Sequence, residues 1–428
     1  MLRMNFKKLT PLALLVAAPL YAAQGDQVGN SRYSVATHNA HALNGVNIAS
    51  MNAHMKQSTS FAYLTSLRVG GEIGDADFAD DIEDLIDELD RDDITLDEAN
   101  ALIDRFNTVL KLAGDKGYAD VNVGLEVPLS MLWKREHDAF SVSTRAYGSA
   151  HVEILDDNVR YNPLQQTLET NAAGYVKVAD MLEFSFGYSR LVWQSTKRDW
   201  EGDLHLGARL NVQRLGLSKQ VIGFQAADGD EDLSDTFLDD YEDFKNEATE
   251  LSLDLSAYWS AKNYNIGLTL SNLNEPEFDY GELGKNCNSL SNDISQSNCL
   301  TALSYSDRID LTETYKATSY ATVQANYISN DNRFSADFSL ESDHITPVGV
   351  EEQWMTASIA YKPETSFAPN TRLTYSNNLV GNELSYLSGE LTWGWFGLGL
   401  GYSLDKTTID GDSTTRGAFL NLAISNQF

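Results

Sequence analysis

Apolar and polar residues alternate along many short segments of this 428-residue chain, and this period of two constrains its fold more than any other feature. Residues 251–259 and 333–341 show it most clearly, because nearly every second side chain is apolar and Ser, Asp or Glu lies between. Successive side chains of a strand point to opposite faces, so the pattern predicts strands with one apolar face. Similar segments recur at 121–127, 140–146, 182–189, 204–212, 264–271, 355–361, 391–395 and 396–403.

Hydropathy and aromatic spacing indicate which kind of β protein this is. Mean hydropathy is −0.32, and beyond the N-terminus there is no apolar run near the length that a spanning helix needs. Tyr315 and Tyr327 bracket small and apolar residues of the same parity. Twelve steps of ~3.3 Å, tilted by ~45°, cover roughly 28 Å, close to the ~25 Å apolar band between aromatic girdles. The sequence therefore predicts an all-β, antiparallel transmembrane barrel.

The two ends of the chain point to export and to an outer membrane. Residues 1–23 resemble a signal peptide, with basic residues, an apolar stretch of about ten residues and then small residues. We expect 24–58 to be a periplasmic or lumenal segment and 59–428 to be the barrel. The last strand ends in Phe428 and resembles the signal by which barrel assembly machinery recognises its substrates. The expected location is thus the outer membrane of a Gram-negative bacterium, with outer-membrane lipid as solvent.

Connection lengths give the strand count and the orientation. Short links fall at 260–263 and 329–332, and the long ones all fall on the opposite side. A periplasmic C-terminus places that side outside the cell. The count is 14 strands, or 16, depending on whether 59–69 is a strand and whether 203–225 is one strand or two. The long links are 226–248, 272–314, 342–352 and 405–415.

One segment, 75–113, departs from the β pattern. Its apolar residues recur at helical spacing over 77–90 and 95–113, and Thr95 to Glu98 reads as a capping box. Gly114 is a candidate helix end. The segment predicts an acidic helical hairpin that plugs the lumen, caps the mouth, contacts a partner or packs only on itself.

Charge and cysteines narrow the function further. The net charge of −31, with acidic clusters at 75–104 and 228–250, excludes a surface for direct nucleic-acid binding. Cys287 and Cys299 are the only cysteines, and after export we expect them to form a disulfide within the external loop 272–314. Their spacing is not C-x-x-C and predicts no thioredoxin-type redox role.

Candidate metal and catalytic sites are weak. Asp228, Asp230, Asp232 and Asp239 follow part of a calcium-loop pattern, but Leu233 stands where such a loop needs Gly. A solvated acidic external loop is therefore the favoured interpretation. We find no catalytic motif and no cofactor fingerprint. The G-x-G-x-G of 397–401 lies in a strand, where small residues facing the barrel interior explain it.

Acidic residues also occur at positions that the alternation assigns to the lumen, namely Glu183, Asp254 and Asp337. Spacing alone does not bring them together, so carboxylate pairing between them stays open.

Several stretches together carry a resemblance to a known family. Ala42 to Ser50 (ALNGVNIAS) resembles the N-terminal segment of fatty-acid-transporter-like (FadL-like) barrels. Asn265 to Leu273 (NIGLTLSNL), followed by Pro276, resembles a strand element of a related group. With the acidic helical insert and the strand 182–190, the chain resembles the β-barrel family of the plasmid conjugal transfer protein TraF. The resemblance implies an outer-membrane barrel grouped with conjugative transfer machinery.

Three functions are compatible with this sequence. The first is a barrel accessory to plasmid transfer or envelope assembly, with conjugation or envelope proteins as partners. The second is a FadL-like channel for small hydrophobic molecules, by analogy of fold. The third is a general porin, which needs an open polar lumen.

Overall fold

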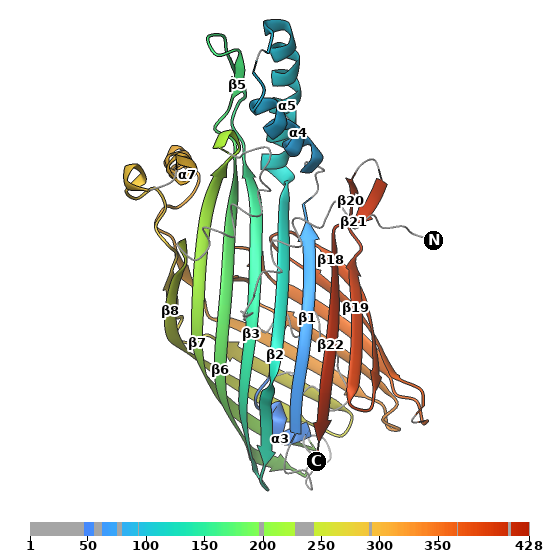
Figure 1. The fold of residues 1–428 in the computed structure, drawn as a ribbon. Coiled ribbons are helices and arrows are strands. Elements are labelled where there is room, and N and C mark those ends of the chain that lie inside the picture. Colours follow the sequence, from blue (N-terminus) through green and yellow to red (C-terminus); the bar gives the residue numbers. More distant parts are fainter. Residues whose placement is uncertain are drawn as a thin grey trace.

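The structure is a computed structural model and describes residues 47–54, 62–74, 79–92, 94–196, 201–226, 244–290, 293–365, 367–409 and 412–427. Fourteen antiparallel strands close into one barrel, each paired with its neighbours in chain order (Figure 1). The wall strands are β1 (Ala62–Ile73), β2 (Tyr118–Lys134), β3 (Asp138–Leu155), β6 (Ala173–Ser195), β7 (Gly202–Gly223), β8 (Asn246–Ser260), β9 (Tyr264–Ser271), β12 (Tyr320–Ile328), β13 (Phe334–Glu341), β16 (Trp354–Tyr361), β17 (Asn370–Asn378), β18 (Ser385–Trp393), β19 (Phe396–Ser403) and β22 (Gly417–Gln427).

The barrel closes where the first strand meets the last. β1 pairs with β22 from Ala62–Gln427 to Glu72–Gly417. Residues 202–223 form the single strand β7 and β1 covers most of the segment 59–69, which settles the predicted count at fourteen. The predicted antiparallel barrel is confirmed.

The wall is apolar outside and polar inside, the reverse of a soluble protein. In β9, Ile266, Leu268 and Leu270 are exposed on the outer face, whereas Asn265 and Thr269 are buried in the lumen. Every neighbouring strand repeats this alternation through the register of the pairing. A closed ring leaves no unpaired edge, so lipid can cover its outer face. Among the helices that the structure describes, none is both long and apolar enough to cross a bilayer.

Aromatic side chains gather on the outer face near the short turns. Phe140 lies 5.2 Å from Tyr188 and Phe334 lies 4.9 Å from Tyr361 (ring centroids). Such girdles mark the level where a barrel leaves the hydrocarbon region. The other members are Trp133, Trp193, Trp259, Tyr264, Tyr327, Trp393 and Trp395.

The proposed bracket by two tyrosines is only half right. Tyr327 belongs to the girdle and is 54% exposed. Tyr315 lies in β11 (Thr314–Lys316), a short strand outside the barrel wall that pairs with β10 (Glu277–Asp279). The prediction failed because residues of β11 have the same parity as those of β12, although three residues separate the two strands. Sequence periodicity cannot detect such a gap.

All connections longer than eight residues lie at one end of the barrel, here called the loop end, and the opposite end, here called the turn end, has only connections of eight residues or fewer (Figure 1). The predicted alternation of link lengths is therefore confirmed. The loop-end connections contain β4 (Arg160–Asn162), β5 (Thr167–Glu169), η1 (Phe224–Ala226), η2 (Cys287–Ser289), α7 (Asp293–Ser304), β14 (His344–Ile345), β15 (Glu351–Glu352), β20 (Lys406–Ile409) and β21 (Asp412–Thr415).

The wall is much taller on one side. β6 and β7 have 23 and 22 residues, whereas β9 and β13 have 8 each. At ~3.3 Å per residue the long strands extend about 75 Å, far beyond a ~25 Å apolar band. Residues 215–223 of β7 are all buried, so the alternation of burial disappears where loops cover this extension.

The helical insert stands on the tall wall and projects away from the membrane (Figure 1). It consists of α4 (Ala79–Leu89) and α5 (Leu96–Lys116), close to the predicted helices. Thr95 caps α5 by accepting from the Glu98 amide at 3.4 Å, as the capping box predicts. Gly114 does not end the helix, which runs on to Lys116 and is capped by Gly117. The position needs a small residue for packing, because a Cβ at Gly114 would lie 2.9 Å from the Asp156 side chain.

A charge on the lipid-facing wall is expected to destabilise the barrel. Leu268→Arg should lower the free energy of unfolding by about 2–4 kcal/mol, because Leu268 points outward between girdle and loop end. Urea titration of the detergent-folded protein measures this, with Leu164→Arg as the control, since Leu164 is 94% exposed outside the wall. Equal stability of the two variants would place Leu268 in water.

Candidate functional site

Each of the three lumenal carboxylates that the sequence singled out meets an arginine. Arg145 lies 3.6 Å from Glu183, and Arg209 lies 2.7 Å from Asp254. Arg372 lies 2.7 Å from Asp337. The acids therefore pair with guanidinium groups and not with one another. The sequence signal was present, because all three arginines occupy lumenal positions of the same alternation, but the register needed to match them comes only from the structure.

A first network joins five strands on the tall side of the lumen. Ser185 lies between Glu183 (2.9 Å) and Asn211 (2.7 Å), and Asn211 donates to Asp254 at 2.9 Å. Asp254 also accepts the backbone amide of Asn272 at 3.0 Å, just after β9. The side chains from β3 to β9 thus share one continuous set of bonds.

A second network crosses the short side. Asn265 donates to Asn326 at 3.0 Å, and Asn326 in turn donates to Asp337. Arg372 then donates to Asp337 at 2.7 Å and lies 4.0 Å from Glu390 on β18. Buried charges of this kind contribute little net stability when paired, but removing one partner leaves the other uncompensated at a cost of about 3–5 kcal/mol.

The N-terminal segment 47–54 lies inside the lumen near the turn end, where Figure 1 shows α3 (Ser50–His54) between the strands. Asn47 donates to the carbonyl oxygens of Ala257 (3.1 Å) and Leu268 (3.2 Å). Ala49 donates to Ser256 at 2.9 Å and accepts from Ser189 at 2.9 Å. The part of the segment 24–58 that the structure describes is therefore lumenal.

Three glycines form the seat of this segment. A Cβ at Gly207 would lie 2.4 Å from Ile48 and 2.6 Å from the Ala49 amide nitrogen. A Cβ at Gly187 would lie 2.6 Å from Ile48, and one at Gly267 would lie 2.8 Å from Asn47. All three face the lumen in neighbouring parts of the wall, so the wall lacks side chains where the segment passes. Sequence reasoning missed this seat, although glycine at a lumenal parity was a usable signal.

The glycines of β19 behave differently. Gly397, Gly399 and Gly401 are buried and face the lumen, as expected for small inward residues. Gly401 makes room for the Phe419 ring, which would lie 2.2 Å from its Cβ. Gly401 thus serves packing inside the barrel.

Beyond the loop end, the helical insert and the hairpin β4–β5 pack into one unit, here called the head (79–92, 94–116 and 156–172). Phe106, Leu110 and Leu168 are buried in its core. Arg105 bridges Asp81 and Asp84 at 2.7 Å each and so ties α5 to α4. The predicted acidic hairpin thus packs on the wall and its loops and does not fill the lumen.

A polar cleft of ≈ 680 Å³ opens on one face of the head. Asp92, Asp157 and Glu169 supply three carboxylates to its lining and Arg160 one guanidinium. Arg160 and Glu169 are opposite each other in β4–β5, whereas Tyr161 and Leu168 on the other face pack into the core. At the tip of the same hairpin Leu164 is 94% exposed.

The connection between β9 and β12, residues 272–319, is here called the strap. It packs on the inner face of the tall wall, where Phe278 and Tyr315 meet Met181 and Leu215. At its base Glu275 binds Lys316 at 2.6 Å and Ser319 at 2.9 Å, and these contacts lower the pKa of Glu275 to about 2.

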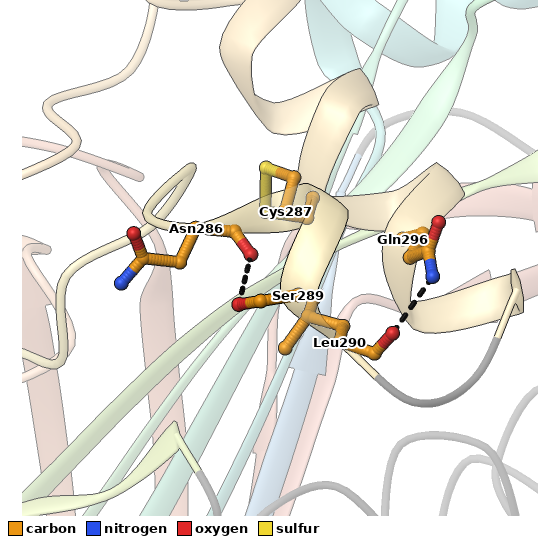
Figure 2. Close-up of a disulfide and its surroundings, with 6 residues drawn as sticks. Asn286, Cys287, Ser289, Leu290 and Gln296 are labelled. Atoms are coloured by element: carbon orange, nitrogen blue, oxygen red, sulfur yellow. Dashed lines mark hydrogen bonds between the residues drawn. A yellow bond between two sulfur atoms is a disulfide. The ribbon is translucent and has the colours of Figure 1, made fainter.

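The strap contains the disulfide that joins Cys287 to Cys299 (Figure 2). Figure 2 also shows Ser289 donating to the Asn286 carbonyl and Gln296 donating to the Leu290 carbonyl. The bond links η2 to α7, and α7 leads to Tyr305, which donates to the carbonyl oxygen of Leu155 on the wall.

Several expectations lie outside the described residues. These are the signal peptide 1–23, the terminal Phe428, and the calcium-loop candidates Asp228, Asp230, Asp232 and Asp239. Within the part of the chain that the structure describes, no three His, Cys, Asp or Glu side chains are placed to hold a metal ion.

Filling the glycine seat should expel the N-terminal segment. Gly207→Leu is expected to raise maleimide labelling of a Ser50→Cys reporter by about tenfold or more, because local opening then exposes a residue that is 1% exposed. The matched control is Gly389→Leu, since Gly389 has open space around its Cβ position. Unchanged labelling with Gly207→Leu would show that the segment is not seated there.

Loss of the disulfide should leave the barrel folded. Cys287→Ser removes a cross-link worth about 3 kcal/mol of chain entropy, but the strap lies outside the lipid-supported wall. Heat-modifiable mobility in SDS gels should therefore persist. A variant that no longer shows the folded band would contradict this assignment.

Comparison with known proteins finds solved structures of low sequence identity. No curated protein sequence matches the chain. The CymD monoaromatic hydrocarbon channel is similar in structure, with a TM-score of 0.47, 9% identity, and coverage of 96% of this chain and 98% of that one. The Ralstonia pickettii toluene transporter TbuX has a TM-score of 0.43, 11% identity, and coverage of 90% and 93%. A Pseudomonas aeruginosa FadL homologue has a TM-score of 0.43, 12% identity, and coverage of 95% and 99%.

The sequence family described as "F plasmid transfer operon, TraF, protein" matches residues 46–341. The match begins at the seated N-terminal segment and covers the head, the tall wall and the strap, which is more than half of the chain. The resemblance seen in the sequence is thus confirmed, and the chain belongs to the TraF family of the F plasmid transfer operon.

Proposed function

We propose that this protein is an outer-membrane barrel that serves plasmid transfer as an accessory component, by docking a partner through its head and not by conducting solutes. The observation that carries the proposal is the occupied lumen. Two side-chain networks line the lumen, and the segment 47–54 is seated within it, where a pore needs open space. Family membership supplies the link to transfer.

The outer membrane is the proposed location. The apolar outer face requires lipid, and the girdle at the turn end fits one interface of a bilayer. The signal-peptide pattern and a periplasmic C-terminus then place the loop end, with the head, outside the cell. The barrel assembly machinery, acting on the strand that ends in Phe428, is the proposed route of insertion.

The head is the proposed docking element. It is rigid, because its core is buried and ion pairs tie its helices together, so little conformational entropy is lost when a partner binds. Its acidic cleft favours a basic protein surface. The same charge disfavours direct contact with DNA, and we propose no catalytic role.

A channel for small hydrophobic molecules is the competing function. The lumenal face carries Arg, Asp, Asn and Ser side chains, and this lining gives an apolar solute no favourable path. A general porin would require the networks and the segment 47–54 to leave an open polar passage. Planar-bilayer recordings distinguish the three, because steady conductance favours the porin and silence with lipid bound inside favours the carrier.

Mating assays test the proposal directly. Deletion of the gene is expected to reduce plasmid transfer, and the full chain supplied in trans should restore it. Asp92→Lys/Glu169→Lys, which reverses two negative charges of the cleft, should restore less, whereas Leu300→Asp on α7 (51% exposed) should restore fully. Transfer that is unchanged by the deletion would remove the accessory role.

A further inference from the structure

The connection between β13 and β16, residues 342–353, is here called the lid, because its tip reaches the opposite part of the wall. The lid starts at β13, and its tip touches β6, although β7, β8, β9 and β12 stand between these strands in the barrel. At the tip, a Cβ on Gly349 would lie 2.9 Å from the Nζ of Lys177 on β6. An element that joins two distant parts of a ring must pass over the opening.

The base of the lid is fixed on both sides. His344 stacks on Tyr320 at 4.5 Å, where β12 begins. The Gln353 amide donates to Asn378 at 2.8 Å, at the end of β17. Only the tip, 346–350, therefore depends on contacts across the mouth for its position.

The tip is seated on the strap by a hydrogen bond and by apolar packing. The Tyr280 hydroxyl donates to the Pro347 carbonyl oxygen. Val348 is 6% exposed in a cluster with Phe278, Tyr280 and Ala179. The pKa of Tyr280 is raised well above its ordinary value by burial and the nearby Glu313 carboxylate, so the phenol keeps the proton that it donates.

Two lysines of the wall hold Tyr280 in place. The Nζ atoms of Lys177 and Lys219 lie 5.4 Å and 5.5 Å from its ring centroid. Both lysines also reach Glu313 on the strap, at 2.7 Å and 3.8 Å. Glu313 thus approaches two largely desolvated ammonium groups beneath the lid tip, and Lys219 also donates to the Asp310 carbonyl oxygen.

We propose that residues 342–353 are a movable lid over the external mouth, and that Tyr280, Lys177, Lys219 and Glu313 form the latch that holds it closed. The argument is one of asymmetry. The base is bonded to β12 and β17 on its two sides, whereas the tip rests on the strap through the Tyr280 hydrogen bond and the packing of Val348 and Val350, so the tip is the part that opens first. The charged groups lie against the Tyr280 ring and hold it in place, so opening of the tip breaks the hydrogen bond to Pro347 and exposes Val348 while the contacts of the lysines with Glu313 remain. The lumen would then be closed at both ends, by the seated segment 47–54 and by the lid.

A cysteine reporter at the tip tests the lid in the full-length, detergent-folded protein. Val348→Cys should react slowly with a membrane-impermeant maleimide in the parent background, since the side chain is buried. Tyr280→Phe, which removes only the donor to Pro347, should accelerate labelling about fivefold. Lys177→Met should accelerate it by more than about tenfold, because Glu313 loses its nearest partner.

The matched control is Lys245→Met. Lys245 pairs with Asp180 at 2.9 Å on the outer face of the same tall wall. Its loss should leave labelling at the parent rate, and heat-modifiable mobility should confirm that all variants are folded. Glu313→Gln provides a second route to the latch if Lys177→Met does not fold. The proposal is overturned if Val348→Cys reacts rapidly in the parent, or if Lys245→Met accelerates labelling as much as the latch variants. Neither result bears on the mating assays.

Discussion

The whole structure depends on the pairing of β1 with β22. Without that seam the first and last strands would present unpaired amide and carbonyl groups to hydrocarbon, where no water can satisfy them. Closure fixes the parity of every strand in turn, because the register Ala62–Gln427 assigns one set of side chains to lipid and the other to the lumen. The polar networks, the glycine seat and the exposed apolar band all follow from that assignment.

The polar lumen also constrains the function of the barrel. Its buried arginines and carboxylates stabilise the interior only as matched pairs, so neighbouring strands must keep their register. Such an interior favours a rigid support over a passage. The tall wall extends this support beyond the membrane and carries the head, whose core continues directly from β3 and β7 through Ile154 and Phe224.

Sequence periodicity was sufficient for the architecture, because strand alternation, link length and the girdle are local properties. The sequence also predicted the ends of both insert helices to within three residues and the disulfide between Cys287 and Cys299. It was insufficient wherever function depends on contacts between distant strands. Arg209 and Asp254 lie opposite each other because of the register between β7 and β8, which no local pattern encodes. The lack of a side chain at Gly207 is explained only by Ile48, which lies against it. Tyr315 was misplaced for the same reason, since parity alone cannot distinguish a wall strand from a short hairpin above it.

The seated segment also has a consequence for biogenesis. Only seven residues separate His54 in the lumen from Ala62, where the first wall strand begins, and they span at most about 27 Å. The segment is therefore tethered beside the seam that closes last if strands are added in chain order. The segment lies near the turn end, where β1 itself begins, so the sheet can close around it as the strands pair. Closure of the barrel and seating of the segment can then take place together.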